Sequence, residues 1–211
     1  DMSLPRPLDG VLVLDLGQIY AGPYAAFLMA MAGATVIKVE PPGVGENLRG
    51  RGKAGDSLPF VILNRNKKAV SLNLKDPRGR ELLMELAGKA DVLVENFAPG
   101  VLDRLGCGWE VLHERNPKLI YASGSGYGLS GPKRGLLAMD LTVQAMSGVI
   151  ASTGFPDQPP VKAGPAISDF LAGVHLFGGV MAALFERTRT GTGRLVEVSM
   201  LEATFPTLSS G

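Results

Sequence analysis

Compact apolar runs alternate along the chain with longer segments in which small or polar residues are mixed with apolar ones. Residues 10–17 (GVLVLDLG) are rich in Val and Leu, which is typical of a strand buried on both faces. Residues 22–34 are small and apolar and predict a helix packed closely on a sheet, and residues 35–40 predict the next strand. This β-α-β order predicts a parallel sheet with right-handed crossovers.

The same alternation continues along the rest of the sequence. Further strands are predicted over residues 68–74, 91–97, 119–128 and, after a turn, 190–200. Asp76 before Pro77 predicts the start of a helix over 76–91 with three leucines on one face, and residues 99–117 predict two short helical turns. The whole pattern predicts an α/β fold with a mostly parallel, Rossmann-like sheet flanked by helices.

One carboxylate, Asp169, stands at the start of an apolar stretch over Phe170–Phe185, which at about 16 residues is short for a membrane span. Ser168 and Asp169 occupy the place of a helix N-cap, and a cap is the simplest interpretation. The apolar neighbours would also take Asp169 partly out of water, so a desolvated carboxylate that acts as a nucleophile is the alternative. His175 is placed nearer the opposite side of this helix and is predicted to be a hydrogen-bonded core residue.

Composition narrows the class of protein. The 211 residues, 45% hydrophobic and 19% charged, predict an ordered chain that forms one large domain, or one domain and part of a second. A net charge of +1 gives no reason to expect nucleic acid or a membrane as partner. The lone Cys107 cannot form an internal disulfide, and with only His113 and His175 beside it no zinc site is expected. The polar start of the chain is unlike a signal peptide, so a soluble cytoplasmic protein is expected.

Two catalytic motifs are considered and rejected. The turn GQIYAG (17–22), followed by Glu40 on the second strand, invites a nicotinamide-dinucleotide interpretation, but it does not fit G-x-G-x-x-G and Tyr20 would crowd a pyrophosphate. Ser123 and Ser125 lie in a glycine-rich loop without the glycine spacing of a hydrolase nucleophile. A loop that lets the backbone approach a ligand is the better interpretation.

Basic residues gather in two loops, 48–53 (LRGRGK) and 64–68 (NRNKK), with Arg104 and Arg115 as isolated charges. Arginine and lysine at the ends of parallel strands suit a polyphosphate ligand. A solvated surface explains any single one of these residues equally well. The clustering in a nearly neutral protein favours the ligand.

Five segments in order along the chain together resemble the class III coenzyme A transferases and the related α-methylacyl-CoA racemases. They are "PLDGVLVLDLGQIYAGPYAAFLMAMAGATVIKVEPPG", "NRNKKAVSLNLKDPRGRELL", "DVLVENFAPGVLDRLG", "GYGLSGP" and "TGTGRLVEVSMLEA". The resemblance runs from Pro7 to about Ala203. It implies the N-terminal half of that family's fold, with its large CoA-binding α/β domain.

The resemblance also implies a site. The family's nucleophilic aspartate falls on Asp169, which would attack an acyl-CoA thioester to give a mixed anhydride and then an aspartyl-CoA thioester, with the helix N-terminus helping to stabilise charge. Coenzyme A enters as a substrate, no permanently bound cofactor is expected, and a small carboxylic acid is the acceptor. The positions implied to contact CoA are Gln18, Ile19, Tyr20, Ala21, Asn66, Lys67, Lys68, Asn96, Phe97, Arg104 and Tyr127. Some members carry an arginine where this chain has Pro41.

One position separates transferases from racemases. The racemases place a histidine proton carrier directly before an aspartate, and this chain has Met139 before Asp140 at that place. A thioether cannot carry a proton at neutral pH, and 1,1-proton transfer needs a base on each face of the carbon. Acyl transfer is therefore favoured over racemisation.

Length is the main departure from the family pattern, because family members are much longer. Residues 1–211 are expected to be an incomplete large domain that lacks the family's smaller second domain and returning C-terminal segment. The resemblance implies an interlocked homodimer for the complete chain and predicts that residues 1–211 alone are nearly inactive. A non-catalytic CoA-binding module is the alternative for this portion, and the acyl group, the acceptor acid and intramolecular transfer stay open.

Overall fold

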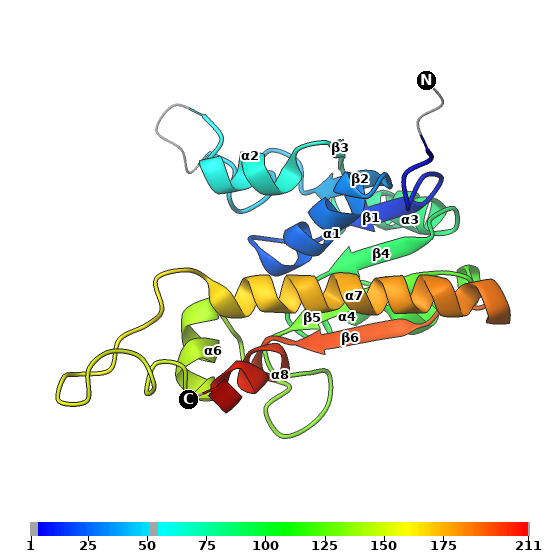
Figure 1. Cartoon of the computed structure of the whole chain (residues 1–211). Helices are drawn as coiled ribbons and strands as arrows, with labels where there is room; N and C mark the ends of the chain where they lie inside the picture. Colours follow the sequence, from blue (N-terminus) through cyan, green and yellow to red (C-terminus); the bar gives the residue numbers. More distant parts are fainter. Residues whose placement is uncertain (1–3, 51–54, 211) are drawn as a thin grey trace.

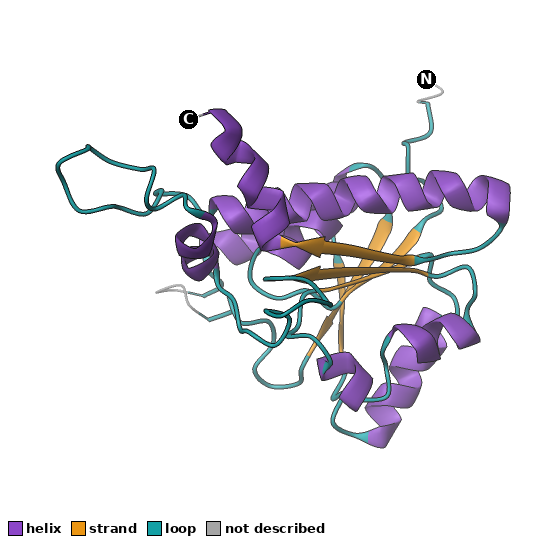
Figure 2. Cartoon of the chain, turned by 90° about the horizontal axis from the view of Figure 1, so that it is seen from below, coloured by secondary structure: helices purple, strands orange, loops and turns teal. Residues whose placement is uncertain are grey.

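Six parallel strands form the centre of the fold, with helices against both faces (Figures 1 and 2). The computed structural model describes residues 4–50 and 55–210. The strands are β1 (Leu12–Asp15), β2 (Thr35–Glu40), β3 (Lys68–Ser71), β4 (Val92–Glu95), β5 (Ile120–Ser125) and β6 (Leu195–Ser199). Their order across the sheet is β3-β2-β1-β4-β5-β6, and every neighbouring pair is parallel. The predicted α/β fold with a Rossmann-like parallel sheet is confirmed.

The helices connect these strands in sequence order. They are α1 (Ala21–Met31), α2 (Leu58–Asn64), α3 (Pro77–Ala87), α4 (Val101–Arg104), α5 (Trp109–Arg115), α6 (Asp140–Ser147), α7 (Ile167–Thr190), α8 (Met200–Thr204) and the 3₁₀ helix η1 (Phe205–Ser210). Helix α3 begins as predicted, with Pro77 at its first position and the Asp76 carboxylate accepting from the Arg78 amide at 2.8 Å. The sequence did not indicate α2 or α6.

Alternation along each strand divides the core between two layers. Val13, Val92 and Ile120 point to one face, where α1 and α7 cover them. Leu14 and Leu93 point to the other face, where α3 and α5 cover them. Because both faces are covered, the central strands contain almost only apolar residues, which explains why the sequence predicted them well.

Helix α7 is the longest element, and it extends beyond the apolar stretch seen in the sequence. It has 24 residues, and by length and mean hydropathy (1.6) alone it is apolar enough to cross a membrane, with 39% of its most apolar window buried. In the structure it lies along the sheet and packs on α1, β5 and β6 (Figure 1). Core helices of globular proteins pass the same composition test, so this helix is read as part of the core.

The order of the strands creates a switch point between β1 and β4. From β1 the chain adds β2 and β3 on one side, then crosses back and adds β4, β5 and β6 on the other. The connections after β1 and β4 consequently leave the sheet in opposite directions and open a crevice at the carboxyl ends of the strands, where open α/β sheets bind ligands.

Candidate active site

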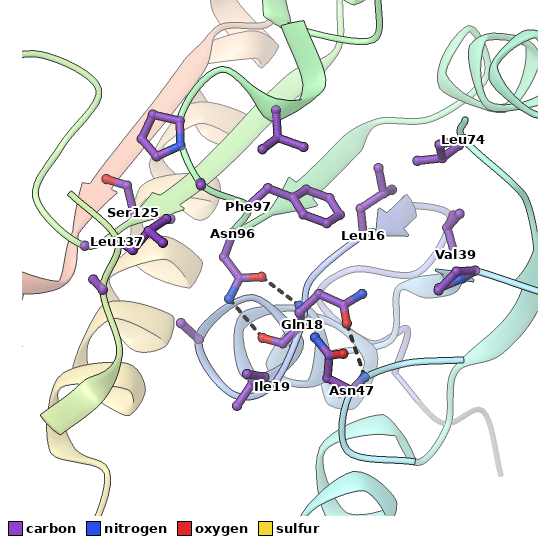
Figure 3. A pocket seen from close by; sticks show the side chains of 18 of the residues that line it. Leu16, Gln18, Ile19, Val39, Asn47, Leu74, Asn96, Phe97, Ser125 and Leu137 are labelled. Atoms are coloured by element: carbon purple, nitrogen blue, oxygen red, sulfur yellow. Dashed lines mark hydrogen bonds between the residues drawn. The ribbon is translucent and has the colours of Figure 1, made fainter. Parts of the chain in front are cut away.

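A cavity of about 570 Å³ occupies this crevice (Figure 3). Most of its wall consists of strand ends and the segments that follow them: residues 16, 18, 19 and 21, then 39–41, 72–75, 96–99 and 124–126, with Met200 after β6. Residues 136–139 and Asp169 close a further side. Of the residues implied to contact CoA, those that line the cavity are Gln18, Ile19, Ala21, Asn96 and Phe97.

Gln18 and Asn96 join the two sides of the switch point. The Gln18 amide donates to Asn96 Oδ1 at 2.7 Å, and Asn96 Nδ2 donates to the Gln18 carbonyl at 2.9 Å (Figure 3). The Gln18 side chain in turn accepts from the Asn47 amide at 3.3 Å. These bonds fix the separation of the turns after β1 and β4, and we call this pair the Gln18–Asn96 clasp.

A buried group of charged side chains supports the turn after β1, which carries Gln18. The Asp15 carboxylate lies 3.3 Å from Lys38 Nζ and 2.7 Å from Lys67 Nζ, and all three side chains are at most 2% exposed. Lys38 also donates to the Gly17 carbonyl at 2.6 Å. Burial alone would raise the pKa of Asp15, but the two ammonium groups outweigh it and hold that pKa below its usual range.

The structure places Lys67, which the resemblance implied as a CoA contact, in this buried group and not on the cavity wall. Its ammonium group is occupied by Asp15, the Pro23 carbonyl and Asn64 Oδ1, and its side chain is 1% exposed. A lysine in this position orders the turn that lines the cavity and has no free donor for a phosphate. The neighbouring Asn66 and Lys68 are exposed and do not line the cavity.

The other predicted basic loop is described in part. Arg49 donates to both oxygens of Glu40, at 2.6 and 2.8 Å, and to Asp56 at 3.0 Å, and its guanidinium lies 4.0 Å from the centre of the Phe60 ring. Its charge is therefore balanced within the protein, and the hydrogen bonds to Arg49 hold the pKa of Glu40 low against the effect of burial. Residues 51–53 of this loop lie outside the described part of the chain.

Asp169 lines the cavity from the third position of α7. Its side chain is partly buried, and within residues 4–50 and 55–210 its carboxyl group has no hydrogen-bond partner. Burial, followed by the negative charge of Asp140, raises the pKa of Asp169 to about 7. Such a carboxyl group is poorly solvated and more basic than an exposed one.

The expected helix cap at Ser168 or Asp169 is wrong. The N-cap of α7 is Ala166, and the amides of Ser168 and Asp169 donate instead to Asp140 Oδ1, at 2.8 and 3.1 Å. The helix begins two residues earlier than a cap at Ser168 requires, so Asp169 lies within the first turn. His175 is hydrogen-bonded, through Nδ1 to the Leu171 carbonyl at 2.8 Å, but it is exposed and does not lie in the core.

The remaining predicted contacts lie beside the cavity. The Tyr20 ring stacks on Phe170 at 5.7 Å and so packs on the first turn of α7. Tyr127 packs partly buried in the apolar cluster around α8, and Arg104 is exposed at the end of α4. The structure therefore does not bring these three side chains into the cavity wall.

The cavity also has lining residues that sequence reasoning missed. They include Asn47, Asn73, Lys75 and the exposed apolar residues Leu136 and Leu137. Lys75 is the cation among the described lining residues. The signal for residues 72–75 was present, since they follow a predicted strand at the carboxyl edge of a parallel sheet. The described residues contain no group of three metal-ligating side chains.

Glu95, at the end of β4, is a second carboxyl group with unusual surroundings. It is 6% exposed, and its Oε2 accepts from the Phe97 amide at 2.9 Å. Burial is the main cause that raises the pKa of Glu95 to about 7. Glu95 does not line the cavity, but it fixes the turn that carries Asn96 and Phe97.

A family model described as CoA-transferase family III matches residues 8–210. The chain is 48% identical over 201 residues to an acetyl-CoA:oxalate CoA-transferase of Acetobacter aceti, which covers 94% of this chain and 52% of the relative. It is 43% identical over 209 residues to a succinyl-CoA–D-citramalate CoA-transferase of Chloroflexus aurantiacus, and this match covers 98% of the present chain and 52% of the relative. It is 39% identical over 212 residues to a human succinyl-CoA:glutarate CoA-transferase, and this match covers 99% of the present chain and 48% of the relative.

Solved structures agree with these relatives. A crystal structure of a CAIB/BAIF family protein from Brucella suis matches with a TM-score of 0.94 at 34% identity, over 98% of this chain and 56% of that one. A Mycobacterium tuberculosis protein in an orthorhombic crystal form matches with a TM-score of 0.92 at 36% identity, over 99% and 59%. The chain spans about half the length of the curated relatives it matches.

Proposed function

The chain belongs to CoA-transferase family III, and from this premise we propose that it transfers coenzyme A from an acyl-CoA to a free carboxylic acid, with Asp169 as the covalent nucleophile. The observation that carries the proposal is the Asp169 carboxyl group itself. It lies on the wall of the cavity, partly buried, with a pKa raised to about 7 and no hydrogen-bond partner among the described residues. A carboxylate without such partners is a better nucleophile than a solvated one.

The reaction proceeds through four transfers at carbonyl carbons. The Asp169 carboxylate attacks the donor thioester, the C–S bond breaks, and a mixed anhydride and CoA thiolate result. The thiolate attacks the aspartyl carbonyl of the anhydride and releases the donor acid. The acceptor carboxylate then attacks the aspartyl-CoA thioester and expels the thiolate, which finally attacks the acceptor carbonyl to give the new acyl-CoA and free Asp169.

The cavity suits a long, thin ligand with one reactive end. Its wall runs from residues 72–75 after β3, past the Gln18–Asn96 clasp, to Asp169 on α7. Coenzyme A placed along it would lay its pantetheine arm against apolar side chains such as Phe97, with the exposed Lys75 near its phosphates. The related transferases named above all take an acyl-CoA donor and a dicarboxylic acid, which supports a small carboxylic acid as acceptor.

Trapping of the covalent intermediate tests the proposal. The complete protein is incubated with acetyl-CoA or succinyl-CoA, and its intact mass is measured with and without hydroxylamine, which cleaves activated acyl groups. An adduct on Asp169 is expected in the wild type and none in Asp169→Asn, whose turnover should fall by roughly 10³-fold or more. Asp157→Asn, an exposed carboxylate outside the cavity wall, serves as the control and should behave like the wild type. An adduct that persists in Asp169→Asn would refute the assignment.

Racemisation is the weaker alternative. Met139 lines the cavity where a proton-carrying histidine would be needed, and the ionisable side chains on the described part of the wall are Glu40, Lys75 and Asp169. Glu40 is held by Arg49 and so is not free to act as a second base beside Asp169. Deuterium from solvent should not enter the α-carbon of a 2-methylacyl-CoA.

We also propose that residues 1–211 form the larger, incomplete domain of an enzyme that works as a homodimer. The relatives are about twice as long, and the cavity rim exposes apolar side chains, with Leu137 81% and Met139 57% accessible. A second domain that covers this rim would keep water from the anhydride. The 211-residue chain alone is expected to show almost no turnover, and normal turnover by it would contradict this division of the protein.

A further inference from the structure

The Asp140 carboxylate, on the first residue of α6, accepts backbone amides from the start of α7. Oδ1 accepts the amides of Ser168 at 2.8 Å and Asp169 at 3.1 Å, although these residues lie 28 and 29 positions further along the chain. These amides are the second and third of α7, and the first four amides of a helix have no partner within it. Asp140 therefore caps a helix to which it does not belong.

Gln144 fixes the other side of this carboxylate. Its Nε2 donates to Asp140 Oδ2 at 2.6 Å and to the Pro165 carbonyl at 3.3 Å, and its Oε1 accepts from the Ala163 amide at 2.9 Å. Gln144 is 1% exposed, so these bonds are shielded from water. The Gln144 side chain of α6 thus holds both the Asp140 carboxylate, which caps α7, and the segment that leads into α7.

The position of Asp140 decides what Asp169 can bind. A carboxylate in the first turn of a helix ordinarily accepts the free amides there, which lowers its basicity. Here the two nearest amides already donate to Asp140, and the Asp169 carboxyl has no partner among the described residues. Asp140 does not line the cavity, so it acts on the reaction through Asp169 and not through substrate.

We propose that Asp140 is a positioning residue of CoA transfer, whose carboxylate takes the amides at the start of α7 and so leaves the Asp169 carboxyl group unbonded on the cavity wall. This inference rests on the proposed function. It replaces the expectation that the helix N-terminus acts directly on the reacting groups through these two amides. The raised pKa of Asp169, to which the Asp140 charge contributes after burial, agrees with it.

The other titratable groups near the start of α7 are few. The elements packed against α7 contribute one such group each, namely Asp140 on α6, Tyr24 on α1, Glu202 on α8, Glu197 on β6 and Tyr121 on β5, and Tyr20, just before α1, stacks on Phe170. On α7 itself the nearest is His175, bound to the Leu171 carbonyl. The Glu202 carboxylate accepts from Ser199 Oγ at 3.0 Å and Glu197 accepts from the Leu129 amide, so both are directed to other partners. Asp140 is the charged group that acts on Asp169.

Two substitutions separate the charge of Asp140 from its hydrogen bonds. Asp140→Asn keeps an acceptor for the two amides and removes the negative charge, whereas Asp140→Ala removes both. In the complete protein, kcat at pH 8 should fall in the order wild type, Asn, Ala, with a loss of roughly 10- to 100-fold for Ala, the size expected from hydrogen bonds to a charged group. The KM for acetyl-CoA should stay within about twofold, because Asp140 does not line the cavity.

The decisive measurement is the titration of Asp169 itself, followed by carboxyl ¹³C NMR in the complete protein and assigned with Asp169→Asn. Removing a neighbouring negative charge favours ionisation, so the midpoint should move to lower pH by roughly one unit in Asp140→Asn. It should move further in Asp140→Ala, where the released amides can bind Asp169. Glu202→Gln, which removes a carboxylate from the adjacent α8, should leave the midpoint unchanged.

The possible failures can be told apart. An Asp169 midpoint that stays in place in Asp140→Asn, in an enzyme that still forms its adduct, overturns the role given to Asp140. A loss of kcat without a shift of the acid limb of the pH profile does the same, because it indicates a purely structural cap. A wild-type protein that forms no adduct with any acyl-CoA instead refutes the proposed function. Asp140→Asn keeps the cap, so a folding failure of Asp140→Ala does not prevent the test.

Discussion

Single hydrogen bonds determine how the cavity wall is shaped, and the Gln18–Asn96 clasp is the clearest case. One asparagine side chain satisfies both the amide and the carbonyl of Gln18, at 2.7 and 2.9 Å, across the switch point of the sheet. The amides on either side are bound by other residues, Gly17 by Asp15 and Ile19 by Glu46. The clasp therefore holds a ligand-binding turn that the strands alone would not fix.

Asn96→Ala should widen this crevice. We expect the KM for acyl-CoA to rise roughly tenfold and the free energy of unfolding to fall by about 1–2 kcal/mol, because two partly buried backbone groups lose their partner. Steady-state kinetics and urea unfolding of the complete protein provide both values. Asn73→Ala removes an asparagine from the same wall whose side chain accepts only from the Lys75 amide within its own turn, and it should change KM less. Equal effects of the two variants would contradict the clasp.

A residue of the site could be predicted from sequence only where its neighbours along the chain indicate whether its side chain is buried. Asp169 was identified through resemblance, and its apolar neighbours correctly indicated partial burial. Lys67 was not foreseen as a buried ion-pair residue, because nothing near "NRNKK" shows that Asp15 lies beneath it. The cap at Asp140 could not be predicted either, since it depends on a contact between residues 28 positions apart.

At the level of elements, the contact between α1 and α7 depends on the absence of a side chain at Gly173. A Cβ at this position would lie 2.9 Å from the Ala21 carbonyl oxygen and 3.0 Å from Tyr24 Cδ1. The two helices can approach this closely only because Gly173 is buried against α1 without a side chain. Their contact also sets the position of the first turn of α7, and hence of Asp169.

Gly173→Ala should therefore separate the two helices and cost about 1–3 kcal/mol of stability, the range for overpacking in a core. Gly178→Ala is the matched control on the same helix, because a Cβ there meets nothing within 4 Å. That change should stabilise the protein by about 0.5–1 kcal/mol, since alanine is the better helix former. Thermal and urea unfolding measure the change in stability of both variants. A destabilised Gly178→Ala protein would show that helix propensity does not determine the effect of alanine on this helix.

The elements predicted from sequence are the ones whose pattern is set by burial on two faces. The strands β1 and β4 are apolar up to their last residue and β5 is apolar in its first half, and all three were predicted within a few residues. Helix α2 was missed because its first six residues are all apolar, with Leu58 70% exposed, so no amphipathic period is visible. The apolar run of α7 stops at Phe185, before the helix does, and Gly191, with φ of 71°, marks the end of the helix.

For the whole molecule, the carboxyl groups with raised pKa values predict how stability varies with pH. Glu95 and Asp169 have pKa values of about 7 in the folded protein and 4.5 and 3.8 as unperturbed groups. Between these limits the folded state holds protons that the unfolded chain has lost, so the free energy of unfolding falls as pH rises from about 4.5 to 7. Asp15 and Glu40, whose pKa values are lowered, act with the opposite sign at more acidic pH.

Glu95→Gln should remove the part of this dependence that comes from Glu95. The variant should be more stable than the wild type at pH 8 by roughly 1–3 kcal/mol, because it no longer requires a buried charge. At pH 4.5 the two proteins should be nearly equal. Urea unfolding across this range measures the effect, with the exposed Glu81→Gln on α3 as the control. A wild type and a Glu95→Gln protein with parallel pH curves would show that Glu95 is ionised in the fold at little cost.

The strand order has a further consequence for synthesis on the ribosome. β1 leaves the exit tunnel before the other strands. On one side it pairs with β2, which pairs with β3, but its partner on the other side, β4, begins only at Val92. Until then the growing polypeptide carries an unpaired edge through Val13 and Leu14, which are fully buried in the finished sheet. Such an edge is a template for wrong pairing between nascent chains. Translation speed across residues 40–92 and the supply of chaperones should therefore govern how much protein reaches the native state.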